Sequence, residues 1–416
     1  MKTSKKEVSR LKNKNTSKKS DINNTNKIKS RQHTKLNRTK KTPTVKKTPT
    51  VKKTPTVKKT PTVKKTPTVI NIKENEYTIA YHTNLKYPTL VIEPINSRTG
   101  ITLAGEKIDR SKFRDPFIPS SKVSLDNQYT WSTYLNSMFL GYSPGHNAPA
   151  GNHKTNQDTY LKTFELTNMC PQEMVFNSGL WVIFENWTKS LVNFKDLYDI
   201  NVITGSSPSF IKKEIPNLPE KYFYSLFDGN NLIPEQLIKQ YQECSKQTIK
   251  VPKSMFKIVL CRHRNLDPET ILYTILDSDN KQFYFKEGGV PVVDKKGKDK
   301  MKVKLKPFSI TINKFESKYK IKFSKIISQV YSRQQNKYNL QFLTNHIFCM
   351  YSLPFLIELQ MKKSYWYGQL IYAKSLEELE SKWDELQEYE ERFRDLQYHR
   401  QYYILRKTML SVIKKD

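Results

Sequence analysis

The chain has 416 residues and a formal net charge of +33, from 72 Lys and Arg against 39 Asp and Glu. It contains no apolar run long enough to cross a membrane, and its first residues lack the apolar core of a secretory signal, so we expect neither a membrane protein nor a secreted one. The four cysteines form no C-x-x-C pair, which predicts buried thiols in a reducing compartment rather than a disulfide or zinc framework. They are Cys170, Cys244, Cys261 and Cys349.

Residues 1–69 form a basic tail. Residues 1–70 hold 23 Lys and Arg against two acids, a net +21 of the chain's +33. Residues 40–69 are five consecutive copies of KKTPTV. With few apolar side chains, such a segment cannot bury enough surface to offset the entropy of ordering it, so we predict that it is disordered. Its charge favours a phosphate anchor or a nuclear localisation signal, and a solvated tail without a partner fits equally well.

Alternating apolar residues predict that the folded part begins near Val69, in VINIKENEYTIAYHT. Residues 126–140 lead into a strand and turn that carry His146, and LYDINVITGS at 197–206 is typical of a core strand. The segments VPKSMFKIVL and YTILDSDNKQFYF predict further strands, and KPFSITINKFESKYKIKF predicts a closing helix that includes Glu316. The intervening KKGKDKMKVKLK is expected to form a basic loop or hairpin.

The C-terminal region, residues 328–416, is expected to be helical. Ser375 and Glu378 have the spacing of a capping box, and Leu376, Leu379, Trp383 and Leu386 follow at helical spacing. These helices can pack on the core or on a second copy of the chain, so a homodimer stays open.

Chemistry-bearing residues concentrate in Gly141–Asn193, in the blocks SPGHNAPA, TFELTNMCPQ and NSGLWVIFE. The His146 imidazole can take a proton from water near neutral pH, which makes it a candidate general base. The amide oxygen of Asn177, at the expected start of a helix, is a candidate ligand for Mg²⁺, which prefers oxygen and keeps most of its waters. On general grounds a lone histidine is more often structural, and an asparagine before a helix is usually a cap.

The three blocks, in this order and spacing, resemble the DNA/RNA non-specific endonucleases of the ββα-metal (His-Me finger) class, the branch that includes endonuclease G. The resemblance covers residues 76–325. It implies an α+β fold, with a central antiparallel sheet flanked by helices in a nuclease domain at residues 70–327. Residues 216–250 would be an insertion into that domain, and the helical extension also has a counterpart among the relatives.

The resemblance also implies roles. His146 would be the base, Asn177 the ligand of Mg²⁺ (with Mn²⁺ as an alternative), and Glu185 would hold metal-bound water. Asn168 would orient neighbouring catalytic groups, while Lys189 and Arg110 would bind phosphate. The chain departs from the family where Pro144 replaces an arginine of the histidine block. Losing such a charged phosphate contact costs roughly 1.5–3 kcal/mol, for which Arg110, Lys154 or a residue of the basic loop could compensate.

Two functions follow. The first is a metal-dependent nuclease that cleaves DNA and RNA with little sequence specificity, because its charges address backbone phosphate and no base-reading motif is visible. The alternative, favoured by Pro144, is a catalytically weakened nuclease fold that binds or packages nucleic acid. In either case DNA and RNA are the expected partners, and the nucleus or a site of DNA replication or packaging is the expected location.

Overall fold

The structure is a computed structural model. It describes residues 68–97, 108, 116–154, 156–219, 235–281, 291–293, 299–301, 308–331, 338–343, 366, 368–390, 403, 406, 407, 410 and 411. All of them belong to one unit, Lys64–Asp416. The predicted tail up to residue 67, together with Arg110 and Cys349, lies outside the described residues.

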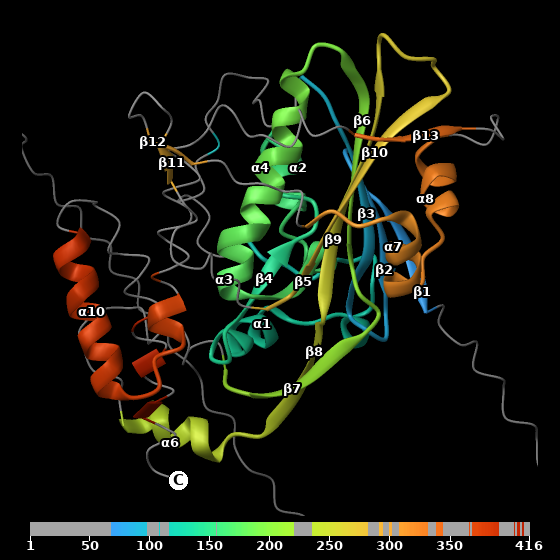
Figure 1. Cartoon of the computed structure of the whole chain (residues 1–416). Helices are drawn as coiled ribbons and strands as arrows, with labels where there is room; N and C mark the ends of the chain where they lie inside the picture. The colour runs from blue at the N-terminus through green and yellow to red at the C-terminus, as the bar shows by residue number, and fades with distance from the viewer. Residues whose placement is uncertain are drawn as a thin grey trace, which may run out of the picture. The chain divides into compact units, whose positions relative to one another are not determined.

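A seven-stranded sheet forms the centre of this unit (Figure 1). Its strands, in spatial order, are β1 (Val69–Lys73), β2 (Thr78–His82), β3 (Tyr87–Ile95), β6 (Leu197–Ser206), β9 (Ser254–His263), β10 (Thr270–Asp279) and β13 (Asn339–Phe342). All neighbours are antiparallel except β10 and β13, which are parallel. The predicted antiparallel sheet is thus confirmed, and its central strands β6 and β9 are buried on both faces over most of their length.

Helices cover both faces of the sheet (Figure 1). On one face lie α7 (Ile312–Tyr319) and α8 (Phe323–Val330), whose apolar side chains pack against Phe256 and Ile275. Glu316 joins these two helices, because its carboxylate accepts the backbone N–H of Phe323 at 2.8 Å. The predicted closing helix is therefore α7, and Glu316 caps the helix that follows it.

The opposite face holds the segment between β3 and β6, which contains the three sequence blocks. Its elements are η2 (Leu125–Asn127), α1 (Trp131–Met138), β4 (Tyr142–His146), α2 (Gln157–Lys162), η3 (Leu166–Asn168), β5 (Met169–Glu173), α3 (Met174–Phe176), η4 (Asn177–Trp181), α4 (Val182–Ser190) and η5 (Leu191–Asn193). From α3 to η5 the chain is one continuous helical segment, and we call β4, β5 and this segment the finger. Its apolar side chains are buried against β6 and β9, as expected; they include Leu180, Trp181, Phe184, Trp187 and Leu191.

The segment between β6 and β9 is a second excursion from the sheet. It forms a hairpin of β7 (Phe210–Pro216) and β8 (Lys246–Pro252), with α6 (Glu235–Glu243) between the two strands. Much of the predicted insertion at 216–250 is thus α6 and most of β8, and its status as an insertion stays a prediction. In the predicted basic region, β11 (Pro291–Val293) pairs with β12 (Asp299–Met301) as a hairpin.

The C-terminal region is helical from Leu376 on, wherever the structure describes it, with α10 at Leu376–Glu390. The backbone N–H of Glu378 donates to Ser375 Oγ at 3.1 Å, which confirms that Ser375 caps α10. The expected domain boundary at residue 327 stays a prediction. The strand β13 lies beyond it and pairs with β10, because the unpaired edge of β10 offers hydrogen bonds that the chain satisfies before it turns helical.

Two further expectations concern cysteines and membranes. Cys170 and Cys261 are buried and Cys244 is half-buried, all three as free thiols. Burial raises the pKa of the Cys170 and Cys261 thiols to about 12, so both stay protonated. No helix among the described residues has the length and apolarity needed to cross a membrane.

Asn280, just after β10, ties the finger to the sheet, and its removal should destabilise the fold. Its Nδ2 donates to Pro171 O and Pro252 O, and its Oδ1 accepts the N–H of Glu173, each at 2.9 Å. We expect Asn280→Ala to lower the free energy of unfolding by about 3 kcal/mol in urea denaturation, because buried partners lose their hydrogen bonds. The exposed Asn265 serves as control: Asn265→Ala should stay within about 0.5 kcal/mol of wild type, and equal effects would contradict this role.

Candidate active site

The site is built on the pairing of β4 with β5. The two strands are antiparallel, with His146 opposite Met169 and Gly145 opposite Cys170. Gly145 has no alternative here, since a Cβ at this position would lie 2.0 Å from Cδ of the buried Gln172. Gly145-His146 of the first sequence block and Pro171-Gln172 of the second therefore lie on the two paired strands, in close contact with each other.

His146 ends β4 in an aromatic setting. Its ring packs edge-on against Phe164, with centroids 4.9 Å apart, and lies 6.1 Å from the ring of Phe117. Its backbone carbonyl accepts the indole N–H of Trp181 at 3.4 Å, which links the strand to the helical segment. Nε2 of the ring is buried.

Asn168 holds the turn that follows His146. Its Oδ1 accepts the N–H of Ala148 at 3.0 Å, and its Nδ2 donates to the carbonyls of Ala148 and Thr163 at 3.0 and 2.8 Å. The backbone carbonyl of Asn168 in turn accepts from the side chain of Asn147. Asn168 is fully buried, so its amide is committed to the backbone. These hydrogen bonds suit the expected orienting role of Asn168, which stays a prediction.

Asn177 lies one turn inside the helical segment, not at its N-cap. The cap is Glu173, whose carboxylate accepts the N–H groups of Val175 at 3.1 Å and Phe176 at 2.6 Å. This corrects the expected capping role of Asn177, because a carboxylate that takes two helix donors fixes the start four residues earlier. Asn177 instead opens a π-helical turn, and its Nδ2 donates to Ser143 Oγ at 3.0 Å. That bond leaves Oδ1 as the ligand atom of the amide.

Glu185 lies on α4 near the buried Lys257 of β9. Burial raises the pKa of Glu185 to about 7; the charge of Lys257 opposes this rise and the charge of Glu93 adds to it. Lys257 is fully buried, with Nζ 2.8 Å from Thr204 Oγ1 and 4.7 Å from the Trp181 ring centroid. Lys257 therefore favours the charged form of Glu185 from within the sheet.

The loop after His146 is held by a second buried group, His153. Its Nε2 lies 3.0 Å from Glu93 Oε2 and its Nδ1 2.8 Å from Glu76 Oε2. Burial lowers the pKa of His153, but the hydrogen bonds and charges of these two carboxylates outweigh it and raise the pKa to about 9. Asn152 also donates to Glu93, at 3.3 Å. Glu76, His153, Glu93, Lys257 and Glu185 thus form a set of alternating charges, which we call the charge row.

Two lysines border the finger. Lys189 Nζ donates to the carbonyl of Gly151 at 3.2 Å, and its pKa is lowered by partial burial and by the charge of Lys154. Two neighbouring like charges favour an anion between them. Lys154 stays one of the candidates for the phosphate contact that Pro144 removes. The role of Arg110 stays a prediction, since that residue lies outside the described part of the chain.

The donor set suits a hard cation that keeps its waters. Among the described residues, no group of three or more His, Cys, Asp or Glu side chains could hold a metal ion. A single amide oxygen from Asn177, with Glu185 about two turns further along the helical segment, fits Mg²⁺ or Mn²⁺ better than zinc, which needs several nitrogen or sulfur ligands.

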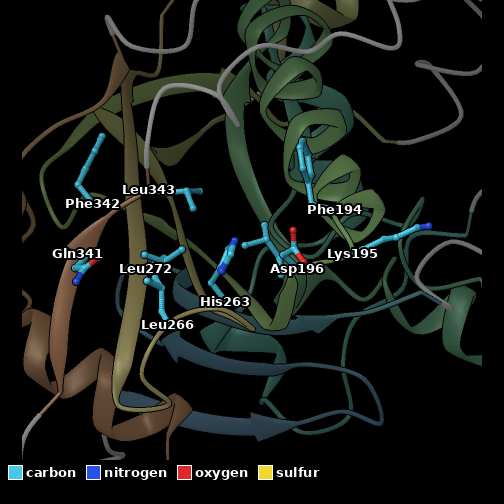
Figure 2. Close-up of a pocket in the computed structure, with 10 residues that line it drawn as sticks. Phe194, Lys195, Asp196, His263, Leu266, Leu272, Gln341, Phe342 and Leu343 are labelled. Carbon is cyan, nitrogen blue, oxygen red and sulfur yellow. The ribbon is translucent and has the colours of Figure 1, made fainter.

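A pocket of about 470 Å³ lies elsewhere, where β6, β9, β10 and β13 meet the chain that leaves η5 (Figure 2). Figure 2 shows Phe194, Lys195 and Asp196 on one side and Gln341, Phe342 and Leu343 on the other. It contains none of the predicted site residues, and its walls are mainly leucine and phenylalanine. The finger, not this pocket, carries the candidate chemistry.

Comparison with known proteins agrees with this architecture. The model of the DNA/RNA non-specific endonuclease family matches residues 55–326, more than half of the chain. The chain belongs to this family. Among its relatives, the mitochondrial nuclease EXOG of Mus musculus is 26% identical over 211 residues, which cover 50% of this chain and 49% of the relative. Nuclease C1 of Cunninghamella echinulata var. echinulata is 29% identical over 170 residues, 40% of this chain and 63% of the relative.

The chain spans about half the length of the EXOG relatives it matches. A solved complex of EndoG with EndoGI is similar to 60% of this chain and 83% of that chain, at 16% identity and a TM-score of 0.42. A likeness of that size carries no argument about the site. Family membership therefore rests on the sequence match, and the ββα order of the finger rests on this structure.

Sequence reasoning missed four residues that support the site. Glu173, His153 and Glu93 belong to no recognised motif, although each is a polar residue inside or beside a predicted buried element. Lys257 gave a clearer signal, since it interrupts the apolar run VPKSMFKIVL. A lysine in the middle of a core strand must be paired or hydrogen-bonded, and that alone could have marked it.

The raised pKa of His153 predicts a pH-dependent contribution to stability. The folded state binds this proton more tightly than the unfolded state, so the contribution, about 3 kcal/mol, is complete below pH 6.5 and is lost as the pH rises through about 9. Urea unfolding of wild type and His153→Gln at pH 6, 7.5 and 9.5 checks this. The stability difference between them should shrink with pH, and a constant difference would show that His153 is neutral in the fold.

Proposed function

We propose that the protein is a metal-dependent nuclease that hydrolyses phosphodiester bonds of DNA and RNA with little sequence specificity. The observation that carries the proposal is the attachment of β4 to the helical segment. Ser143 accepts from Asn177, and the His146 carbonyl accepts from Trp181, so the candidate base and ligand lie on two elements bound to each other. Membership of a nuclease family supports the same reaction.

In this mechanism each residue has one task. His146 takes a proton from the attacking water through its imidazole, and the edge-on Phe164 ring keeps that imidazole in place. Lys189 and Lys154 attract the phosphate and stabilise the charge that develops on it. Asn177 would hold Mg²⁺ or Mn²⁺ through Oδ1, and Glu185 would accept hydrogen bonds from its waters. When bound, the cation would supply Lewis-acid stabilisation of the phosphate and the leaving oxygen.

The proposed substrates are nucleic acids recognised through their backbone. Lysines at the finger address phosphate, which is common to DNA and RNA and carries no sequence information. The basic tail would add affinity in the same way. We also propose an intracellular location. The nuclear alternative stays a prediction, which the names of the mitochondrial relatives do not favour.

The rival proposal is a weakened nuclease fold that binds or packages nucleic acid. Pro144 favours it, because the arginine that it replaces would supply a charge-assisted phosphate contact worth about 1.5–3 kcal/mol. A plasmid-nicking assay of the wild-type chain, with Mg²⁺ and with EDTA, separates the two. Cleavage in Mg²⁺ alone supports the enzyme, and plasmid binding without cleavage supports the rival.

Replacing the candidate base should separate cleavage from binding. We expect His146→Ala to slow Mg²⁺-dependent nicking by about 10²–10⁴-fold, the usual contribution of a general base, with plasmid affinity within about twofold of wild type. His263→Ala, a change of the same kind at the pocket of Figure 2, should nick at the wild-type rate. If His146→Ala retains more than a tenth of the rate, another group is the base.

Asn177 should be a direct metal ligand and Glu185 an outer one. A crystal soaked in Mn²⁺ should show the ion within about 2.0–2.3 Å of Asn177 Oδ1. Asn177→Ala should raise the Mn²⁺ concentration needed for half-maximal nicking, and Glu185→Ala should cost about 10–100-fold in activity or affinity. Asn193→Ala, at the exposed far end of the same helical segment, is the control. Manganese bound away from Asn177 would refute its assignment as ligand.

A further inference from the structure

The C-terminal extension reaches the finger at one polar contact. The hydroxyl of Tyr372 donates to Oε1 of Glu173, the residue that caps the helical segment carrying Asn177. The two residues are 199 positions apart in the chain. Glu173 is 5% exposed, so its carboxylate needs partners inside the protein.

Glu173 uses both carboxylate oxygens. Oε1 accepts the N–H of Val175 as well as the Tyr372 hydroxyl, and Oε2 accepts the N–H of Phe176. Its own N–H donates to Asn280. The direction of the carboxylate, and hence the first turn of the helical segment, is therefore set by donors from two parts of the chain, while Asn280 holds the Glu173 backbone from a third. Asn177 follows Phe176 directly, so the position of its side chain depends on that turn.

Apolar packing accompanies the contact. Ile371 is 4% exposed and packs in a cluster with Leu135, Phe139 and Met174, the first residue of α3. Gly141, just before β4, has φ +80°, and a Cβ there would lie 3.6 Å from both Ile371 Cγ2 and Tyr372 Oη. Leu370 and Ala373, by contrast, pack in the extension's own cluster with Leu379 and Leu386. The middle two residues of this short stretch, Ile371 and Tyr372, thus pack toward α1 and the finger, and the outer two pack within the extension.

We infer that the C-terminal extension positions the metal ligand: Tyr372 orients the Glu173 cap, which fixes the helical turn that presents Asn177. Tyr372 is a positioning residue, since it touches the cap and not the reacting atoms. The assignment of Asn177 as ligand rests on the proposed function, whereas the effect of Tyr372 on the helical turn does not.

Hydrogen exchange tests the inference on the full-length, metal-free protein. Tyr372→Phe removes one oxygen and keeps the ring. We expect the peptide spanning residues 174–181 to exchange about tenfold faster than in wild type, because the cap loses a hydrogen bond to a charged group. Glu173→Ala removes the cap itself and sets the upper limit. Tyr403→Phe is the matched control: its hydroxyl also donates to a glutamate, Glu380 at 2.5 Å, but within the extension. It should leave this peptide unchanged.

Two further readouts follow the effect to the ligand. Mn²⁺ affinity, measured by electron paramagnetic resonance, should fall severalfold in Tyr372→Phe and not in Tyr403→Phe. The kcat for nicking should fall, with KM for plasmid unchanged.

Wild-type exchange at 174–181 in Tyr372→Phe would overturn the inference, even if the wild-type chain is an active nuclease. Faster exchange with unaltered Mn²⁺ affinity would show that Tyr372 acts on the helical turn only, and it would overturn the link from Tyr372 to the ligand. A wild-type chain that neither binds Mn²⁺ nor cleaves would instead refute the proposed function.

Discussion

The finger works only if it is fixed to the sheet, and much of that fixation is electrostatic. Lys257 is fully buried in β9, where an unpaired ammonium would be very costly. Thr204, the Trp181 ring and the charges of Glu185 and Glu93 offset that cost. Each of these partners comes from an element that must be in place for the site to form. The burial of one lysine therefore links the sheet to the helical segment, and Glu93 extends this link to the loop after His146 through His153.

Two kinds of support hold the candidate catalytic groups. Hydrogen bonds to the backbone, from Asn168 and Asn280, fix the path of the chain around β4 and β5. The side chains of the charge row hold the elements to one another. They do so at places where the backbone N–H and C=O groups already have hydrogen-bond partners. Breaking one partner of a buried pair leaves the other charge uncompensated, so these supports are cooperative. Few of them touch the expected substrate position, yet the geometry of the site depends on all of them.

Local patterns in the sequence were enough to predict the sheet and the finger helix, whereas the roles of His146, Asn177 and Glu185 came from the family resemblance and stay proposals. The segment LYDINVITGS, predicted as a core strand, matches β6 residue for residue and is buried from Ile200 to Ser206. The same reasoning misplaced the helix start, because the apolar run from Met174 to Phe176 conceals a cap that only the geometry of Glu173 reveals. It could not find Tyr372 at all, since a single sequence carries no record of which distant residues meet. The strand β13 was missed for the same reason: its four residues are a strand only because β10 is beside them.

Pro144 and Pro171 face each other across the β4–β5 ribbon. Neither has an N–H, so at this level the ribbon offers no donor on either strand, and the carbonyl of Pro171 is already bound by Asn280. A strand from another molecule that approached the ribbon here would find no donor with which to continue the sheet. The substitution that removes a positive charge from the histidine block thus also makes this short ribbon a poor template for intermolecular β-pairing, which is the route by which exposed strands aggregate.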